Sequence, residues 1–190
     1  MLSLLVFICV SCKKETYAEI KTPKGNIIVK LYTERAPITC ANFLKLIENK
    51  MLQNGQFYRV VRMDNQPDND IKIEVIQGGI DNDDLDYPPI MHESTNDTGV
   101  LHKDGTISMA RLEPGSATTE FFICIGDQPE LDFGGMRNPD GQGFAAFGKV
   151  IKGMEIVREI QKMKQQNQML INPVPFSIKA EVKKVFAKFN

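Results

Sequence analysis

The feature that most constrains the fold is a series of short apolar or alternating segments separated by turns rich in Pro and Gly. Eight segments have the length and pattern of β-strands: 17–22, 26–32, 57–61, 73–77, 108–111, 121–125, 144–150 and 176–183. Only two stretches carry the longer periodicity of a helix. Closing a sheet on itself removes its exposed edge strands. The sequence therefore predicts a mainly β fold, a closed eight-stranded antiparallel barrel capped by two α-helices.

The two helical stretches are 37–50 and 154–163. Pro37 suits the first turn of a helix, where its missing N–H costs nothing. Apolar residues behind it fall at positions i, i+3, i+4 and i+7, namely Cys40, Phe43, Leu44 and Ile47. A chain of 190 residues can form one domain with a substantial core. We expect the helices to plug the ends of the barrel.

The strand 121–125 shows how this barrel can carry a binding site. Alternate side chains of a strand point to opposite faces. Phe121 and Ile123 therefore share one face, and Glu120, Phe122 and Cys124 share the other. If the first face is the core, the second presents an aromatic ring beside a carboxylate, which is a minimal apolar pocket with an orienting polar group.

The N-terminus differs from the rest of the chain. Residues 2–10 are nearly all apolar and are followed by Ser11, Cys12 and two lysines. The run is too short to span a bilayer, and it resembles a bacterial lipoprotein signal. We expect residues 1–11 to be a signal peptide cleaved before a lipidated Cys12, 12–16 to be a short tether, and 17–190 to be the domain. The protein would then be anchored in the cell envelope, with its domain periplasmic or extracellular; an uncleaved apolar N-terminus is the alternative.

Charge and cysteine content exclude some classes of function. The formal net charge is −1 and no long basic run occurs, which argues against a nucleic-acid partner. Cys40 and Cys124 each lie in an apolar pattern. This pattern favours buried free thiols, with a disulfide in an oxidising compartment as the alternative.

No metal or cofactor motif is present. His92 and His102 are isolated, and the acidic run 81–86 lacks the Gly and Glu of a calcium loop, so we interpret it as a solvated turn. The residue counts alone leave a Ser–His–Asp arrangement open. However, Ser108 lies in an apolar strand and no nucleophile-elbow pattern accompanies it.

A set of short motifs runs in order through most of the chain. They include Ala36-Pro37, Asn42-Phe43, 57–61, Gln77-Gly78-Gly79, 105–110, 121–123, Leu131-Asp132, 147–150 and Gly153-Met154. In order and spacing the chain resembles the cyclophilin-type peptidyl-prolyl cis-trans isomerases. The resemblance implies a barrel that binds proline-containing peptides and unfolded protein clients without a cofactor. A monomer is our default expectation, since the sequence carries no signal of oligomeric state.

The resemblance also implies a site. Arg59 matches the catalytic arginine, Gln77 the glutamine that hydrogen-bonds near it, and Phe122 the base of the proline pocket. The remaining substrate-binding residues that it implies are Phe57, Val75, Met109, Ala110, Arg111, Leu112, Glu120, Leu131 and Phe144.

Several positions depart from the family pattern. Glu120 stands where Gln is common, Glu74 falls where a pocket Phe is usual, and Phe144 replaces a His or Tyr. Glu130 stands where some members carry a Trp that binds cyclosporin, which argues against sensitivity to that drug. The polar segment 62–72 is longer than usual, and we interpret it as an exposed insertion within a hairpin.

Isomerisation needs no nucleophile, metal or cofactor, because no covalent bond is broken. It needs an apolar pocket for the ring and a fixed donor, which the fork of an arginine provides. Glu120 leaves two alternatives: an ion pair with Arg59, or acceptance of a peptide N–H. Two functions follow: an isomerase acting on exported proteins through Arg59, or a non-catalytic peptide-binding module on the same barrel.

Overall fold

The computed structural model describes residues 12–80 and 87–186. The expected signal peptide 1–11 and the acidic turn 81–86 lie outside the described residues. Among the described residues, no helix is long and apolar enough to cross a bilayer.

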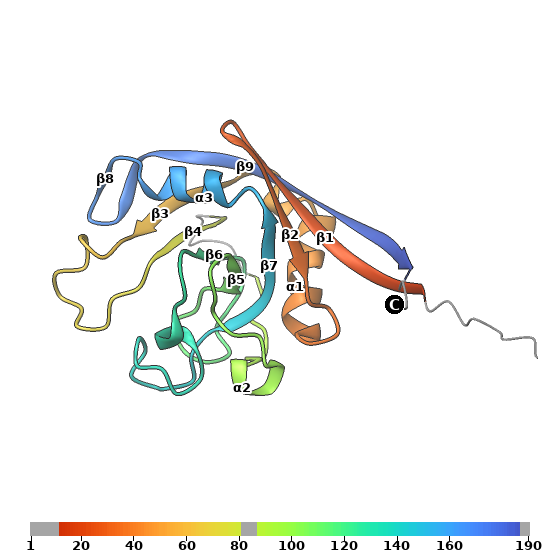
Figure 1. Cartoon of the computed structure of the whole chain (residues 1–190), viewed down its shortest axis with the longest axis horizontal. Coiled ribbons are helices and arrows are strands. Elements are labelled where there is room, and N and C mark those ends of the chain that lie inside the picture. The colour runs from red at the N-terminus through yellow and green to blue at the C-terminus, as the bar shows by residue number, and fades with distance from the viewer. Residues whose placement is uncertain (1–11, 81–86, 187–190) are drawn as a thin grey trace, which may run out of the picture.

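The described chain forms a closed antiparallel barrel (Figure 1). Its strands are β1 (Cys12–Thr22), β2 (Gly25–Leu31), β3 (Gly55–Val61), β4 (Val75–Gly79), β5 (Thr106–Met109), β6 (Phe121–Cys124), β7 (Ala145–Lys152) and β9 (Met169–Phe186). They are hydrogen-bonded in the order β1-β2-β7-β5-β6-β4-β3-β9, and the pairing of β1 with β9 closes the ring. The two-residue strand β8 (Gln165–Gln166) is an addition at the edge of β9. The predicted barrel is confirmed.

Helices cover the ends of the barrel, as predicted. They are α1 (Pro37–Glu48) and α3 (Met154–Gln161). Three short helices, α2 (Thr95–Thr98), η1 (Met51–Asn54) and η2 (Pro129–Leu131), lie in the connections between strands. The sequence pattern missed α2 because four residues are too few to show a helical period. Its start is instead marked by a capping box, in which Ser94 and Asp97 exchange side-chain and backbone hydrogen bonds.

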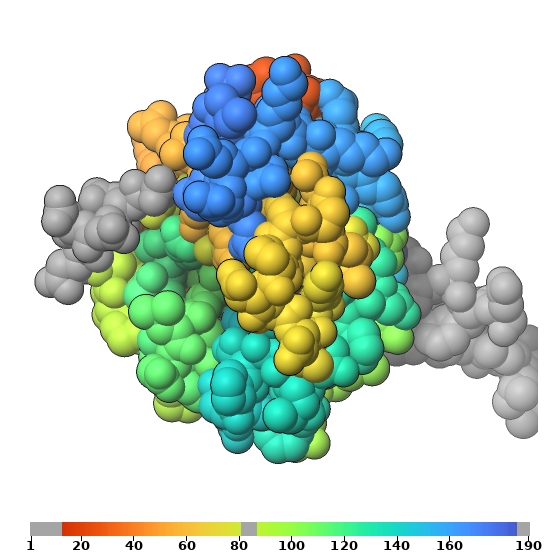
Figure 2. Space-filling model, turned by 90° about the vertical axis from the view of Figure 1, so that its left-hand side faces the viewer, coloured from red at the N-terminus to blue at the C-terminus, as the bar shows by residue number. Residues whose placement is uncertain are grey.

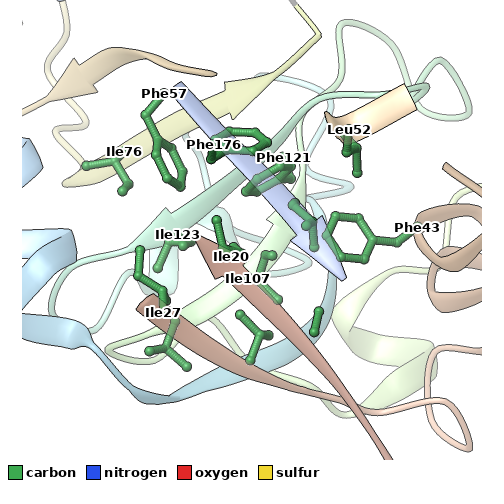
Figure 3. Packing of buried hydrophobic residues seen from close by; sticks show 14 of the residues in the cluster. Ile20, Ile27, Phe43, Leu52, Phe57, Ile76, Ile107, Phe121, Ile123 and Phe176 are labelled. Atoms are coloured by element: carbon green, nitrogen blue, oxygen red, sulfur yellow. The ribbon is translucent and has the colours of Figure 1, made fainter. Parts of the chain in front are cut away.

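Aromatic side chains form the centre of the core (Figure 3). Phe57 and Phe176 lie with their ring centroids 4.9 Å apart, and Phe121 packs 5.6 Å from Phe176. Phe43 of α1 reaches into the barrel and meets Phe121 edge-on at 5.5 Å. Fully burying such a side chain stabilises a fold by about 1.5–3 kcal/mol. This cluster therefore fixes α1 to the barrel and β6 in its register.

Cys40 and Cys124 are both free and buried, as the sequence pattern favoured. Burial raises the pKa of the Cys40 thiol to about 12. A thiol in this state behaves as a small apolar group rather than as a nucleophile.

Gly78 and Gly79 are the last two residues of β4. A Cβ atom on Gly78 would lie 2.7 Å from the carbonyl oxygen of Gln56, so this glycine allows β3 and β4 to pack closely.

Residues 12–16 were expected to be a tether, but they form the first part of β1. They pair with 182–186 of β9, from Cys12 opposite Phe186 to Thr16 opposite Val182. The two strands together form a ribbon that extends away from the barrel (Figure 1).

Candidate functional site

One groove of about 620 Å³ crosses the outer face of β3, β4 and β6. Figure 2 looks onto this side of the molecule, where the surface is hollowed between residues near 110 (green) and the segment 62–72 (yellow). The groove is lined by Tyr58, Arg59, Ile73, Val75, Gln77, Ile80, Ala110, Arg111, Leu112, Ser116, Thr118, Thr119, Glu120, Phe122, Leu131, Arg137, Asn138 and Phe144.

The alternation predicted for strand 121–125 is confirmed. Phe121 and Ile123 lie in the barrel core, whereas Phe122 and Cys124 belong to a second apolar cluster. That cluster contains Val61, Ile73, Val75 and Leu131, with Ala110 and Phe144 packed against it. Phe144 meets Phe122 edge-on, with centroids 5.3 Å apart. The groove therefore has an apolar floor centred on Phe122.

Glu74, which the family resemblance placed at the pocket, does not line the groove, whereas its neighbour Ile73 does. Ile73, Val75 and Gln77 share one face and line the groove. Glu74 points the other way, where its carboxylate accepts a hydrogen bond of 3.2 Å from Gln161. Neighbouring residues of an extended chain face opposite sides, so Glu74 lies away from the groove that Ile73 and Val75 line.

Two predicted site residues, Phe57 and Met109, do not reach the groove. Both are fully buried in the barrel core. Met109 pairs with Phe121 across the sheet and shares its inward face, while Ser108 pairs with Phe122. Phe57 faces inward because the register of β3 shifts between Phe57 and Arg59.

This bulge also places Arg59. In a regular strand Phe57 and Arg59 would share a face, but the extra residue, Tyr58, separates them. Phe57 stays in the core, and Arg59 turns outward opposite Gln77 of β4.

The guanidinium of Arg59 is held from two sides. Its Nη1 donates to Oε1 of Gln77 at 2.8 Å, which is the contact that the sequence predicted. Its Nε and Nη2 both donate to Oε1 of Gln168, at 3.0 and 2.6 Å. Burial lowers the pKa of Arg59, and the nearby Tyr58 and Glu120 oppose that shift. Arginine keeps its charge under such conditions, so the groove holds a fixed cation.

Gln168 was not found by sequence reasoning. It lies in the turn between β8 and β9 with a φ of 70°. Its side-chain amide donates to the carbonyl of Asn65 at 3.0 Å, which orients its oxygen toward Arg59. A single polar residue in a turn carries no periodic signal, so only the fold reveals this contact.

Glu120 is not ion-paired with Arg59 within the described residues. Its Oε2 accepts a hydrogen bond of 2.7 Å from Nε2 of Gln77 and another from the hydroxyl of Tyr58. Gln77 in turn donates to the Tyr58 hydroxyl at 2.8 Å. The carboxylate therefore acts on Arg59 through Gln77, because it fixes the amide whose oxygen binds the guanidinium.

A Ser–His–Asp arrangement is present beneath the groove. His102 contacts Oδ1 of Asp132 at 2.7 Å through Nδ1, and Oγ of Ser108 at 3.0 Å through Nε2. The imidazole stacks on Phe122, with centroids 5.9 Å apart and planes at 16°. Ser108 and His102 are only 0% and 1% exposed. A substrate cannot reach a nucleophile buried in this way, so we interpret the three residues as support for Phe122.

The segment Ala110–Leu112 forms one rim of the groove. Arg111 is fixed by an ion pair with Asp140, with Nη1 and Oδ2 2.7 Å apart, and this contact lowers the pKa of Asp140 to about 2. The side chain of Leu112 is 87% exposed at the rim. Among the described residues, no group of three or more His, Cys, Asp or Glu side chains is placed to hold a metal ion.

The chain is similar to known prolyl isomerases over most of its length. Residues 17–180 match the family model described as "Cyclophilin type peptidyl-prolyl cis-trans isomerase/CLD". A peptidyl-prolyl cis-trans isomerase of Acinetobacter baylyi is 34% identical over 84% of this chain and 79% of its own. Isomerase A of Dickeya dadantii is 34% identical over 80% of this chain and 74% of its own. Isomerase B of Escherichia coli is 32% identical over 74% of this chain and 80% of its own.

Solved structures agree on the fold. A cyclophilin-type isomerase of Cryptosporidium parvum, crystallised in the presence of the dipeptide Ala-Pro, has a TM-score of 0.67 and 20% identity over 85% of this chain and 96% of its own. A second structure of that isomerase has a TM-score of 0.69 and 19% identity over 93% of this chain and 99% of its own.

Proposed function

The chain belongs to the cyclophilin-type peptidyl-prolyl cis-trans isomerases, whose reaction is the rotation of X–Pro peptide bonds, and we propose that it carries out this reaction in the groove around Arg59 and Phe122. The observation that carries the proposal is the position of Arg59. Its guanidinium is held by Gln77 and Gln168 in a groove whose floor is apolar.

The chemistry requires only that the twisted bond be stabilised. Amide resonance gives a peptide bond a rotation barrier of roughly 18–20 kcal/mol. Even for X–Pro bonds, uncatalysed isomerisation takes tens to hundreds of seconds. No bond breaks, so the enzyme has to bind the twisted form more tightly than either planar isomer.

The groove supplies both requirements. The apolar residues Phe122, Val75 and Leu131 can hold the proline ring by excluding water. Arg59 can then donate a hydrogen bond to the peptide group as it rotates. Because Gln77 and Gln168 already fix the guanidinium, little reorganisation accompanies this step.

Turnover of a proline-containing peptide by Arg59→Ala and Arg59→Lys tests this proposal. Both variants should lose activity by about 10²–10³-fold, the usual loss when one positioned donor is removed. Arg158 lies on α3, outside the groove, so Arg158→Ala is a matched control and should keep wild-type turnover. Equal rates for Arg59→Ala and wild type would refute the role of Arg59. Peptide binding without any turnover by wild type would instead indicate a non-catalytic binding module.

We also propose that the clients are exported proteins and that Cys12 carries a lipid anchor. The apolar run 2–10 and the Ser11-Cys12 pair support this localisation. In the native host, Cys12→Ala should move the protein from the membrane fraction to the soluble fraction. Unchanged membrane association of that variant would contradict the anchor.

A further inference from the structure

We propose that the groove contains a second, cationic subsite centred on Arg137, which selects clients with an acidic side chain next to the X–Pro bond. This inference rests on the proposed function and deepens it, because it names the class of substrate. The subsite lies where two loops meet, the segment 62–72 and the loop between η2 and β7.

Contacts between the two loops hold Arg137 in place. Its Nη1 donates to the carbonyl oxygen of Ile71 at 2.6 Å, and its backbone N–H donates to the carbonyl of Glu130 at 3.1 Å. The side chain is partly buried and lines the groove. In Figure 2 the yellow segment 62–72 lies directly beside the teal residues of the second loop.

The segment 62–72 is held together by its own hydrogen bonds. Gln66 is 1% exposed, and its amide donates to the carbonyls of Arg62 and Ile73 at 2.7 and 2.8 Å. Its oxygen accepts from the backbone N–H of Ile73 at 3.3 Å. The sequence predicted an exposed insertion here. In the structure the segment folds around the buried amide of Gln66, so it can hold Arg137 in one position.

The part of the groove around Arg59 and Arg137 carries positive charge that no acidic side chain of the described residues pairs with. Within the described residues, neither Arg59 nor Arg137 has an ion-pair partner, whereas Arg111 is neutralised by Asp140. Burial and the positive charge of Arg59 both lower the pKa of Arg137, so the two guanidinium groups act on each other.

Two acids beside the groove, Glu120 and Glu130, are engaged by other groups. Glu120 binds Gln77 and Tyr58. The carboxylate of Glu130 accepts from the backbone N–H of Met136 at 2.9 Å. The structure thus offers two fixed cations to whatever occupies the groove.

A carboxylate is the ligand that fits this arrangement. Arginine forms bidentate, charge-assisted hydrogen bonds with carboxylates, and a partly buried pair of like charges is relieved by an anion. A neutral peptide leaves that repulsion in place. We therefore expect glutamate beside the proline to be preferred over glutamine by about tenfold, as for one charged hydrogen bond.

The test uses the full chain and peptides that differ only on either side of the proline. Glu, Gln or Lys is placed before or after the proline, and catalysed cis–trans exchange is measured by NMR at low and high salt. Wild type should prefer Glu over Gln by about tenfold in at least one position, and high salt should reduce the preference. Arg137→Gln should abolish the preference while it still isomerises the Gln peptide. Arg137→Lys should retain part of it, and the control Arg158→Gln should retain all of it.

The outcomes separate this inference from the proposed function. Efficient isomerisation with no Glu preference at either position overturns the subsite and leaves the isomerase intact. A preference that survives in Arg137→Gln overturns the assignment to Arg137. If no peptide is isomerised, the proposed function fails. Peptide binding measured by fluorescence anisotropy then tests the subsite on its own. In that case, Glu peptides that bind no tighter than Gln peptides overturn it.

Discussion

Gln168 positions Arg59 through its side-chain oxygen. It binds two nitrogens of Arg59, and its own amide is held by Asn65. Gln168→Gly removes the amide but tolerates the left-handed backbone, since the φ of Gln168 is 70°. We expect kcat to fall by roughly three- to tenfold with KM little changed, the effect of one or two hydrogen bonds.

Asn167→Gly is the matched control for Gln168. Asn167 occupies the same turn with a φ of 51°, and the change leaves the amide of Gln168 in place. Steady-state kinetics of the two variants separate the loss of the contact from the loss of turn rigidity. Equal kcat values for both variants would show that Gln168 does not position Arg59.

Glu120 is the most unusual residue of the groove. Its carboxylate accepts hydrogen bonds from Gln77 and Tyr58, so it orients the amide that binds Arg59. Glu120→Gln keeps an acceptor oxygen, and we expect turnover within about threefold of wild type. Glu120→Ala frees Gln77, and we expect a fall of about tenfold, consistent with the loss of one hydrogen bond. If Ala is tolerated better than Gln, this positioning role is wrong.

His102 links stability to pH. Burial lowers its pKa below the ordinary 6.5, although Asp132 opposes this shift. The unfolded chain therefore binds a proton near pH 6.5 that the folded chain does not bind. The free energy of unfolding should fall as pH drops below about 6.5, by up to about 1.4 kcal/mol per pH unit from this one residue.

Denaturant unfolding between pH 5.5 and 8 checks this prediction. His102→Gln should be less stable than wild type at pH 8, because Ser108 and Asp132 lose their partner. Its stability should also depend less on pH in the window below 6.5. An unchanged slope in His102→Gln would contradict the assignment.

At the level of elements, the segment 62–72 connects the site to the rest of the fold. Its Asn65 carbonyl holds Gln168, and its Ile71 carbonyl holds Arg137. Gln66→Ala removes three hydrogen bonds from the base of this segment and should cost about 1–3 kcal/mol of local stability. Hydrogen exchange at the Ile73 amide should accelerate, and turnover should fall. Asp68→Ala, an exposed change in the same segment, should do neither, and identical behaviour of the two variants would contradict the prediction.

The elements also show how far the sequence could predict the site. The two faces of 121–125 were separable because a strand has a period of two, and both faces were assigned correctly. The predicted groove position of Phe57 was wrong because the bulge at Tyr58 depends on pairing with β4 and β9, which the local sequence does not show. The predicted groove position of Met109 was wrong because the cross-strand register with Phe121 decides which face Met109 occupies. Contacts made by isolated loop residues, such as Gln168 and Arg137, depend on the folded path of two distant segments.

For the molecule as a whole, the ribbon of β1 and β9 and the groove lie at different ends. The first residues of β1 pair only with the last residues of β9. A chain that begins at Thr16 should therefore keep the barrel and its isomerase activity, with a melting temperature lowered by no more than a few degrees. Calorimetry and peptide turnover of this shortened chain check the prediction. Loss of activity would show that the ribbon supports the groove.

If Cys12 carries the proposed lipid anchor, the ribbon sets which side of the enzyme faces the membrane. In Figure 1 it projects to the right, whereas the groove opens on the left-hand side that Figure 2 shows. Cys12 to Thr16 would extend the ribbon by roughly 13 Å, at about 3.3 Å per residue. A lipid on Cys12 would thus be joined to the barrel by a paired, comparatively rigid β-ribbon rather than by a flexible linker. The groove would then face away from the membrane. Such an orientation suits polypeptides already released into the surrounding compartment better than those still emerging from the bilayer.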